Sequence, residues 1–347
     1  METRTFGRTA EGKEASLYTI ANHAGMRVLV TDFGATVVSV FVKDKNGKDT
    51  DVIFGYDNVE EYQNGMSYFG ATVGRNCNRI SDAKITIDGV EYLLDNNDRG
   101  NNLHSGPNGV SKRMWNVKEH SESSITFQIE DADRQQGFPG NADIQVTFAV
   151  TEKNELAISY HAVADKKTVF NFTNHSYFNL NGVGNGTAME HILQIQASHY
   201  TPVQDARAIP TGELAPVEGT PFDFREPKPI GRDVDEKHEQ LGYGNGYDHN
   251  FALDRKTSGV EKVATVYSQK SGIQMDVYTD CVGLQLYSAN FAPAQTGKGG
   301  KTYNGRDAFC LETQYFPNAV NEPDFITPLT PAGEAYESQT IYAFSIV

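Results

Sequence analysis

The chain has 347 residues, of which 38% are hydrophobic, and its 45 acidic and 30 basic residues give a formal net charge of -15 at pH 7. This charge disfavours binding to nucleic acid or to anionic membranes, because both ligands require a basic surface. No stretch approaches the ~18 consecutive apolar residues that a membrane-spanning helix needs. We therefore expect neither nucleic acid nor a membrane as a partner; the charge is compatible with a neutral ligand but selects no substrate by itself.

The cysteines and the first residues of the chain indicate a reducing compartment. Cys77, Cys281 and Cys310 are widely spaced and form no C-x-x-C pair, so neither a disulfide framework nor a zinc–cysteine site is expected. The first residues lack the apolar run of a secretory signal peptide. We therefore expect a cytoplasmic protein.

The first clear element along the chain is a hairpin predicted over residues 84–94. Apolar residues occupy every second position on both sides of Asp88-Gly89, which is typical of half-buried strands. An Asp-Gly pair between two such runs predicts a two-residue type I′ turn, because both central residues of that turn need a positive φ.

The same alternation recurs through the rest of the chain and predicts an all-β protein. It predicts strands over 125–129, 144–150 and 156–160, and a further hairpin from 275–278 and 283–287. The best helical candidate, 233–241, is short and highly charged. Many short strands with few short helices predict a large antiparallel β-sandwich. Because the sequence contains no Pro- or Ser-rich linker and no fixed-period repeat, we expect a single domain over 1–347.

Two polar segments flank the predicted hairpin. Residues 74–80 contain two arginines and two asparagines, and residues 101–106 contain a single histidine, His104. Each segment alone is more typical of a solvated turn than of a binding site. The competing interpretation is a set of hydrogen-bond donors directed at a neutral polyol.

A third polar segment, residues 171–180, favours a functional interpretation. If it is a strand, alternation places five hydrogen-bonding residues on one face. Such a face does not suit an ordinary sandwich core and suits the floor of a polar cleft. The five residues are Asn171, Thr173, His175, Tyr177 and Asn179.

Two carboxylates are the remaining candidates: Asp248 lies in Gly246-Tyr247-Asp248-His249-Asn250-Phe251, and Glu312 lies in a largely apolar stretch. A charge inside an apolar strand is costly unless it is paired or points outward, so an outward position at a sheet edge is the ordinary interpretation of Glu312. The alternative is a partly desolvated base whose pKa is raised by burial.

These polar segments, in this order, closely resemble the aldose 1-epimerase family over nearly the whole chain. The sequence differs from the family pattern at Cys77, where alanine is usual, and at Ser105, where glycine is frequent; neither is expected to do chemistry. The motifs that carry the resemblance are residues 32–36, 52–57, 74–80, 103–104, 173–180, 311–314 and 331–336.

The resemblance implies a β-supersandwich with an open cleft, which interconverts the α and β anomers of hexoses such as galactose and glucose. It implies that Glu312 is the general base and His175 the general acid, and that His104 assists them. It implies no cofactor and no metal, and the chain is expected to act as a monomer or homodimer on a monosaccharide. The residues implied in sugar binding are Asn78, Arg79, His104, Tyr177, Asp248 and Gln285.

The chemistry of anomer exchange agrees with these residue types. One group must take the proton of the C1 hydroxyl while another gives a proton to the ring oxygen O5, so that the C1–O5 bond breaks and can close on the other face. A carboxylate suits the first transfer, and an imidazolium, which titrates near ~6.5, suits the second. Glu312 would need a pKa above its usual ~4.3.

Three other interpretations stay open at this point. A glycoside hydrolase could use Asp248 and Glu312 as its carboxylate pair, with roughly 5 to 9.5 Å between the two groups. A non-catalytic carbohydrate-binding protein would keep the hydrogen-bond donors without needing a Glu–His pair. A metal site could use His104, His175 and Asp248, although their spacing carries no specific signature.

Overall fold

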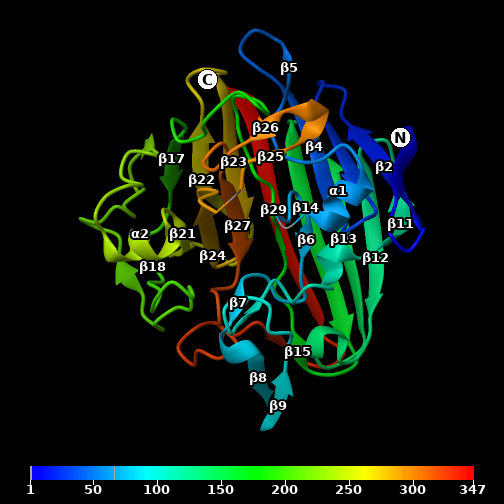
Figure 1. Ribbon diagram of the computed structural model, residues 1–347, viewed down its shortest axis with the longest axis vertical. Coiled ribbons are helices and arrows are strands. Elements are labelled where there is room, and N and C mark those ends of the chain that lie inside the picture. The colour runs from blue at the N-terminus through cyan, green and yellow to red at the C-terminus, as the bar shows by residue number, and fades with distance from the viewer. Residues whose placement is uncertain (1, 66, 292) are drawn as a thin grey trace.

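The computed structural model describes residues 2–65, 67–291 and 293–347. Antiparallel sheets dominate these residues, and the two α-helices among them have six residues each (Figure 1). The prediction of an all-β, antiparallel sandwich with few short helices is therefore confirmed. Neither helix of the described residues has the length and hydrophobicity that a membrane span requires.

The largest sheet has nine strands and runs through the centre of the molecule (Figure 1). Its central strands alternate strictly between buried and half-buried positions, because one face of an antiparallel sheet packs on the core. The strands, in spatial order, are β11 (Asn116–His120), β12 (Ser124–Asp131), β13 (Ala142–Val150), β14 (Glu155–Ala164), β29 (Ala335–Ile346), β23 (Ile273–Thr279), β22 (Glu261–Tyr267), β17 (Ile192–Ile195) and β20 (Lys228–Pro229).

Two five-stranded sheets share a core with this central sheet. One continuous apolar cluster contains Val28 and Val40, Phe127 and Ile158, and also Leu311, so it joins all three sheets. Complete burial of each such side chain contributes roughly 1.5–3 kcal/mol to folding. The first sheet consists of β1 (Glu2–Arg8), β2 (Glu14–Ala21), β3 (Arg27–Thr31), β4 (Thr36–Lys43) and β5 (Asp49–Asp51); the second consists, in order, of β19 (Ala215–Pro216), β18 (His199–Tyr200), β21 (Asp248–Ala252), β24 (Gly283–Tyr287) and β27 (Cys310–Gln314).

Short strand pairs and helices complete the described part of the chain. Two of these pairs bring polar segments that are distant in sequence side by side: Thr72–Val73 pairs with Thr173–Asn174, and Arg79–Ile80 pairs with Asn102–Leu103. The remaining elements are β6 (Thr72–Val73) with β16 (Thr173–Asn174), β7 (Arg79–Ile80) with β10 (Asn102–Leu103), β8 (Lys84–Ile87) with β9 (Val90–Leu93), β15 (Thr168–Val169) with β28 (Leu329–Thr330), β25 (Gln295–Thr296) with β26 (Thr302–Tyr303), the α-helices α1 (Val59–Asn64) and α2 (Glu239–Gly244), and the 3₁₀ turns Ser81–Ala83, Val110–Lys112, Gln135–Gly137 and Lys298–Gly300.

The hairpin predicted over 84–94 is confirmed by β8 and β9. Ile87 pairs with Val90 across the turn, and Asp88 and Gly89 have φ values of 51° and 81°. Both values lie in the left-handed region that a type I′ turn requires.

Two sequence-based predictions of local structure were wrong. Residues 275–278 and 283–287 do not form a hairpin: β23 pairs with β22 and β29 in the central sheet, whereas β24 pairs with β21 and β27 in another. The helix predicted over 233–241 begins only at Glu239, because His238 is its N-cap: its backbone is extended and its side chain accepts from the backbone N–H of Gln240. Alternation shows that a strand is present but does not identify its partner.

Candidate active site

A cleft of about 440 Å³ lies along the second five-stranded sheet. This volume falls in the range of small-molecule binding sites. Its lining residues come from sequence segments spread over about 250 positions, so tertiary structure assembles the site. They are Ser67, Tyr68, Asn78, Arg79, Leu103, His104, His175, Tyr177, Asp248, Tyr287, Phe291, Pro293 and Glu312.

Three neighbouring strands, β21, β24 and β27, build one wall of this cleft by simple alternation. Residues opposite one another in antiparallel strands share a face, and the intervening positions, such as Leu284 and Leu311, are buried in the core. Polar groups therefore accumulate on the cleft side of the sheet. The cross-strand rows are Asp248–Tyr287–Cys310 and Asn250–Gln285–Glu312.

The opposite wall comes from the polar segments of the sequence. The pairing of β7 with β10 places Arg79 opposite Leu103, so Asn78 and His104 are adjacent. The backbone N–H of His104 donates to the carbonyl of Asn78 over 3.0 Å. His175 and Tyr177 follow β16 and reach the same cleft.

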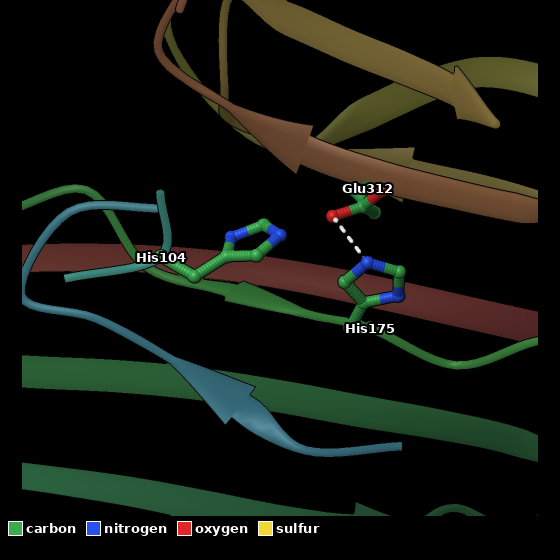
Figure 2. A group of neighbouring side chains, drawn as sticks. All are labelled: His104, His175 and Glu312. Atoms are coloured by element: carbon green, nitrogen blue, oxygen red, sulfur yellow. Dashed lines mark ion pairs between the residues drawn. The ribbon is translucent and has the colours of Figure 1, made fainter. Parts of the chain in front are cut away.

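Glu312 and His175 both line the cleft, and their side chains face each other (Figure 2). Oε2 of Glu312 lies 3.6 Å from Nε2 of His175, and both side chains are less than 10% exposed. Burial, with the nearby charge of Asp248, raises the pKa of Glu312 to about 8. Burial lowers the pKa of His175 to about 4. The outward-facing interpretation of Glu312 is therefore wrong.

His104 completes this group and has a defined tautomer. Its Nδ1 accepts a hydrogen bond from the backbone N–H of Asn78 over 3.1 Å, so the neutral ring carries its proton on Nε2. Burial and the neighbouring His175 lower the pKa of His104 well below its usual value. The two rings meet edge to face, with centroids 5.3 Å apart. His104 is thus a neutral hydrogen-bond donor beside the pair.

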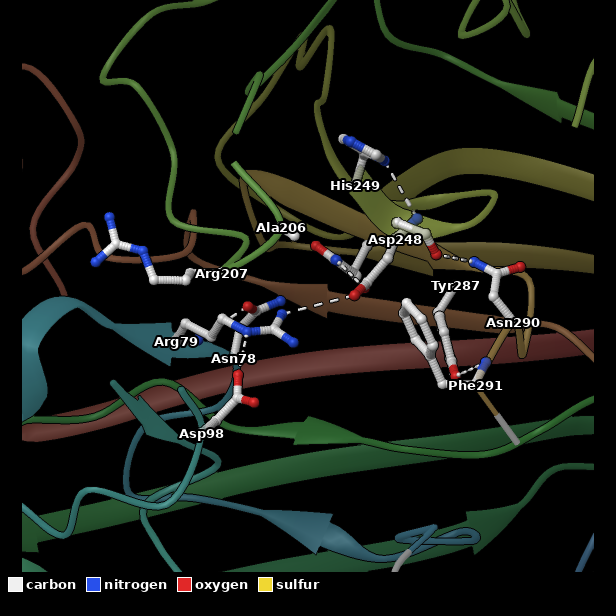
Figure 3. A network of polar contacts seen from close by, with 12 residues as sticks. Asn78, Arg79, Asp98, Ala206, Arg207, Asp248, His249, Tyr287, Asn290 and Phe291 are labelled. Carbon is white, nitrogen blue, oxygen red and sulfur yellow. Dashed lines mark hydrogen bonds and ion pairs between the residues drawn. The ribbon is translucent and has the colours of Figure 1, made fainter. Parts of the chain in front are cut away.

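Arg79 lies between two carboxylates along the cleft (Figure 3). Its Nε donates to Asp98 over 2.8 Å, and its Nη1 lies 3.6 Å from Oδ2 of Asp248. Asp248 also accepts from Nε2 of Gln285 over 2.8 Å. These contacts hold a cationic donor and an anionic acceptor side by side, which suits recognition of neighbouring sugar hydroxyls.

Gln285 lies beneath the cleft lining rather than in it. Its Oε1 accepts from Nε2 of Gln314, whose Oε1 in turn accepts from Nδ2 of Asn78 over 3.4 Å. This amide chain connects the support of Asp248 with that of Asn78. Gln285 therefore supports the carboxylate of Asp248, and its direct contact with a sugar stays a prediction.

Three side chains of metal-ligating type meet in the described part of the site. The ligand atoms of His104, His175 and Glu312 all lie within 4.8 Å of one another. The group considered from sequence had Asp248 as its third member, but Asp248 pairs with Arg79 instead. Two imidazoles and a carboxylate are a ligand set that zinc accepts, so the absence of a metal requirement stays a prediction.

The segment 171–180 forms the cleft floor only in part. The strand β16 covers two of its residues, so the five-residue polar face that a longer strand would present does not form. The amides of Asn171 and Asn179 bond to backbone groups of other segments. Of the five residues predicted on this face, His175 and Tyr177 line the cleft.

Sequence reasoning identified Tyr177 but missed three other aromatic residues of the cleft. Tyr68, Tyr287 and Phe291 line it, and the hydroxyl oxygen of Tyr287 accepts from the backbone N–H of Phe291 over 3.0 Å. Tyr287 could have been found, since it lies two residues after Gln285 on the same strand face. Tyr68 and Phe291 lie in loops, where no periodic signal identifies a facing partner.

Known proteins with similar sequences and structures match nearly the entire chain. The family model of aldose 1-epimerase matches residues 16–343. A galactose mutarotase from Sus scrofa is 41% identical over 322 residues, which is 92% of each chain. An aldose 1-epimerase from Escherichia coli is 36% identical over 337 residues, or 96% of each chain. The solved structure of an aldose epimerase homologue from C. elegans matches with a TM-score of 0.89 at 32% identity, covering 96% of this chain and 99% of that one.

These matches confirm the resemblance that the sequence motifs indicated. The family model and both relatives extend over the strands and loops that build the cleft. The chain is a member of the aldose 1-epimerase family, and it is an isomerase.

Proposed function

We propose that this protein is a mutarotase that interconverts the α and β anomers of free aldohexoses such as galactose and glucose. One observation carries the proposal: a buried carboxyl and a buried imidazole lie 3.6 Å apart in a cleft of about 440 Å³ that polar and aromatic side chains line. Glu312 takes the C1 hydroxyl proton and His175 gives a proton to O5. When the ring closes on the other face, the two transfers run in reverse.

The proton content of the pair supports these roles. With pKa values of about 8 for Glu312 and about 4 for His175, the pair holds one proton at neutral pH. At neutral pH the proton is on Glu312, and His175 is neutral. If that proton moves from Glu312 to His175, the pair becomes a carboxylate and an imidazolium without any change in the number of protons. A bound sugar hydroxyl at Glu312 and a ring oxygen at His175 stabilise that charged combination by hydrogen bonds.

Sugar binding is assigned to groups away from the reacting bond. Arg79 and Asp248 act as donor and acceptor for hydroxyls, Asn78 and Tyr177 add contacts, and Nε2–H of His104 donates near C1. Gln285 supports the carboxylate of Asp248. Because closure occurs from either face of C1, affinity has to depend on the hydroxyls that both anomers share.

We also propose the remaining features that sequence analysis suggested. The chain acts as a single domain over 1–347, as a monomer or homodimer, in the cytoplasm. It needs neither a cofactor nor a metal, because the reaction transfers only protons and releases no leaving group. Dialysis against a chelator is expected to leave activity unchanged, and activity restored only by zinc would contradict this.

The test is to follow freshly dissolved α-galactose and α-glucose by polarimetry or anomeric proton NMR with catalytic amounts of protein. We expect equilibration faster than the spontaneous rate, and no acceleration by the same protein after heat denaturation. Release of sugar from aryl glycosides without faster mutarotation would support a hydrolase. Sugar binding with no rate increase would support a carbohydrate-binding protein.

A further inference from the structure

Cys310 is a buried thiol that the proton transfers proposed above do not use. It is the first residue of β27, and its side chain is completely buried. Side chains two positions apart on a strand point to the same side, so Cys310 and Glu312 share the cleft face. Sγ of Cys310 lies 3.6 Å from Nδ1 of His175, while Glu312 faces Nε2 of that ring. One strand therefore contacts both nitrogens of one imidazole.

The plane of the His175 ring is fixed by aromatic neighbours, but its orientation within that plane is not. The ring stacks on Tyr177, with centroids 5.0 Å apart and an interplanar angle of 13°, and lies nearly parallel to Tyr68. A half-turn about the Cβ–Cγ bond preserves this stacking and exchanges each nitrogen for a carbon. Selecting one orientation therefore requires a partner that distinguishes nitrogen from C–H.

The thiol is that partner at Nδ1. Among the described residues, the only side chain that forms a hydrogen bond to Nδ1 of His175 is Cys310. The contact at the other nitrogen, 3.6 Å from Glu312, is longer than a good hydrogen bond. Nδ1 and Sγ are also shielded from water, since Cys310 is fully buried and His175 is 5% exposed.

A thiol suits a ring that changes its protonation state in each turnover. The proton leaves and returns at Nε2, so Nδ1 keeps its own proton in both states, and the uncharged sulfur accepts weakly from Nδ1–H. A carboxylate at this place would favour the imidazolium and weaken it as an acid. Burial, together with the charge of Glu312, raises the pKa of Cys310 well above its usual value, so the group stays an uncharged thiol.

We propose that Cys310 is a positioning residue for the reaction: it holds His175 through Nδ1, so that Nε2 faces the ring oxygen of the sugar. This inference rests on the proposed mutarotase function, in which Nε2 gives the proton to O5. The strand β27 would then carry both the base, Glu312, and Cys310, the residue that orients the acid His175.

The test compares Cys310→Ala, Cys310→Ser and the matched control Cys281→Ser, whose thiol contacts Asp280 instead. Anomeric NMR gives kcat and KM, and ¹⁵N NMR of the histidine rings gives the tautomer of His175. We expect Cys310→Ala to lower kcat roughly three- to tenfold with KM within about twofold, as for loss of one hydrogen bond. We expect Cys310→Ser to recover most of kcat, because a hydroxyl also donates and accepts, and Cys281→Ser to match the wild type.

The nitrogen spectra separate positioning from a packing effect. Cys310→Ala should shift the balance of Nδ1–H and Nε2–H forms of His175, and Cys310→Ser should move the Nδ1 resonance. Unchanged kcat and unchanged His175 resonances in Cys310→Ala would overturn the proposal, as would a serine variant as slow as the alanine variant. If Cys310→Ala does not fold, an unmoved Nδ1 resonance in Cys310→Ser overturns it. Absence of mutarotation in the wild type would refute the proposed function instead, and the spectra would still test the contact.

Discussion

Two buried pairs of opposite potential charge show how differently this fold uses polar groups. Nε of Arg75 lies 2.5 Å from Oδ2 of Asp131, and both side chains are at most 4% exposed. The side chains of Glu312 and His175 are buried to a similar extent, but Oε2 of Glu312 lies 3.6 Å from Nε2 of His175. The first pair is saturated with partners and the second is not.

The surroundings of each pair explain the difference. The guanidinium of Arg75 also donates to four backbone carbonyls, and Asp131 accepts from Arg113 as well. Oε2 of Glu312 forms no hydrogen bond with the described residues. A saturated buried pair stabilises a fold, whereas an unsaturated one costs stability and leaves its atoms free for a ligand. We infer that the Arg75 pair is structural and the Glu312 pair is functional.

The largest expected effect is on catalysis, from Glu312→Gln. The amide has nearly the same shape but cannot take the C1 hydroxyl proton, so kcat should fall by roughly 10²- to 10⁴-fold. Polarimetry with galactose measures kcat, and circular dichroism checks the fold. A rate near that of the wild type would remove Glu312 from the role of base.

The matching change in the structural pair is Arg75→Met, which keeps length and removes the donors. It leaves Asp131 with fewer partners and several carbonyls unpaired, so the free energy of unfolding should drop by about 3–5 kcal/mol. Urea denaturation measures this loss, and kcat of the folded variant should stay within about threefold of the wild type. A loss of activity without a loss of stability would contradict the distinction between the two pairs.

Glu312→Gln should also stabilise the protein near neutral pH. The unfolded chain releases the Glu312 proton near pH 4.5, whereas the folded protein holds it up to about pH 8. The free energy of unfolding of the wild type therefore falls as the pH rises between these values, and the variant lacks this loss. We expect a gain of about 1–3 kcal/mol at pH 7–8 in urea titrations. A less stable variant would show that Glu312 is well solvated or paired.

The pH dependence of kcat/KM should report the single proton of the pair. That proton is present between about pH 4, set by His175, and about pH 8, set by Glu312. Activity should be flat from pH 5 to 7 and roughly tenfold lower by pH 9, after subtraction of the spontaneous rate. Activity that keeps rising above pH 9 would argue for a permanently ionised base.

The smallest effect is expected from Arg79→Lys. An ammonium cannot keep the two-sided contact with Asp98 and Asp248, so KM should rise roughly three- to tenfold with little change in kcat. Arg207→Lys is the matched control, because Arg207 is half-exposed and pairs with Asp205. Equal KM values for both variants would exclude Arg79 from sugar binding.

The sequence predicted the kind of elements better than their partners. Alternation and Asp88-Gly89 identify strands and a turn because both are local properties. The separation of β23 from β24 into different sheets is not local, and neither is the contact of Gln285 with Asp248, which depends on the pairing of β24 with β21. The motifs pointed to the polar residues of the site, whereas Tyr68 and Phe291 approach it only through loop conformations.

The most direct test of the account is a crystal structure of Glu312→Gln with galactose bound. The account predicts the C1 hydroxyl within hydrogen-bond distance of the side chain at position 312, and O5 within hydrogen-bond distance of Nε2 of His175. A well-ordered sugar whose C1 points to the open end of the cleft, away from both groups, would contradict it.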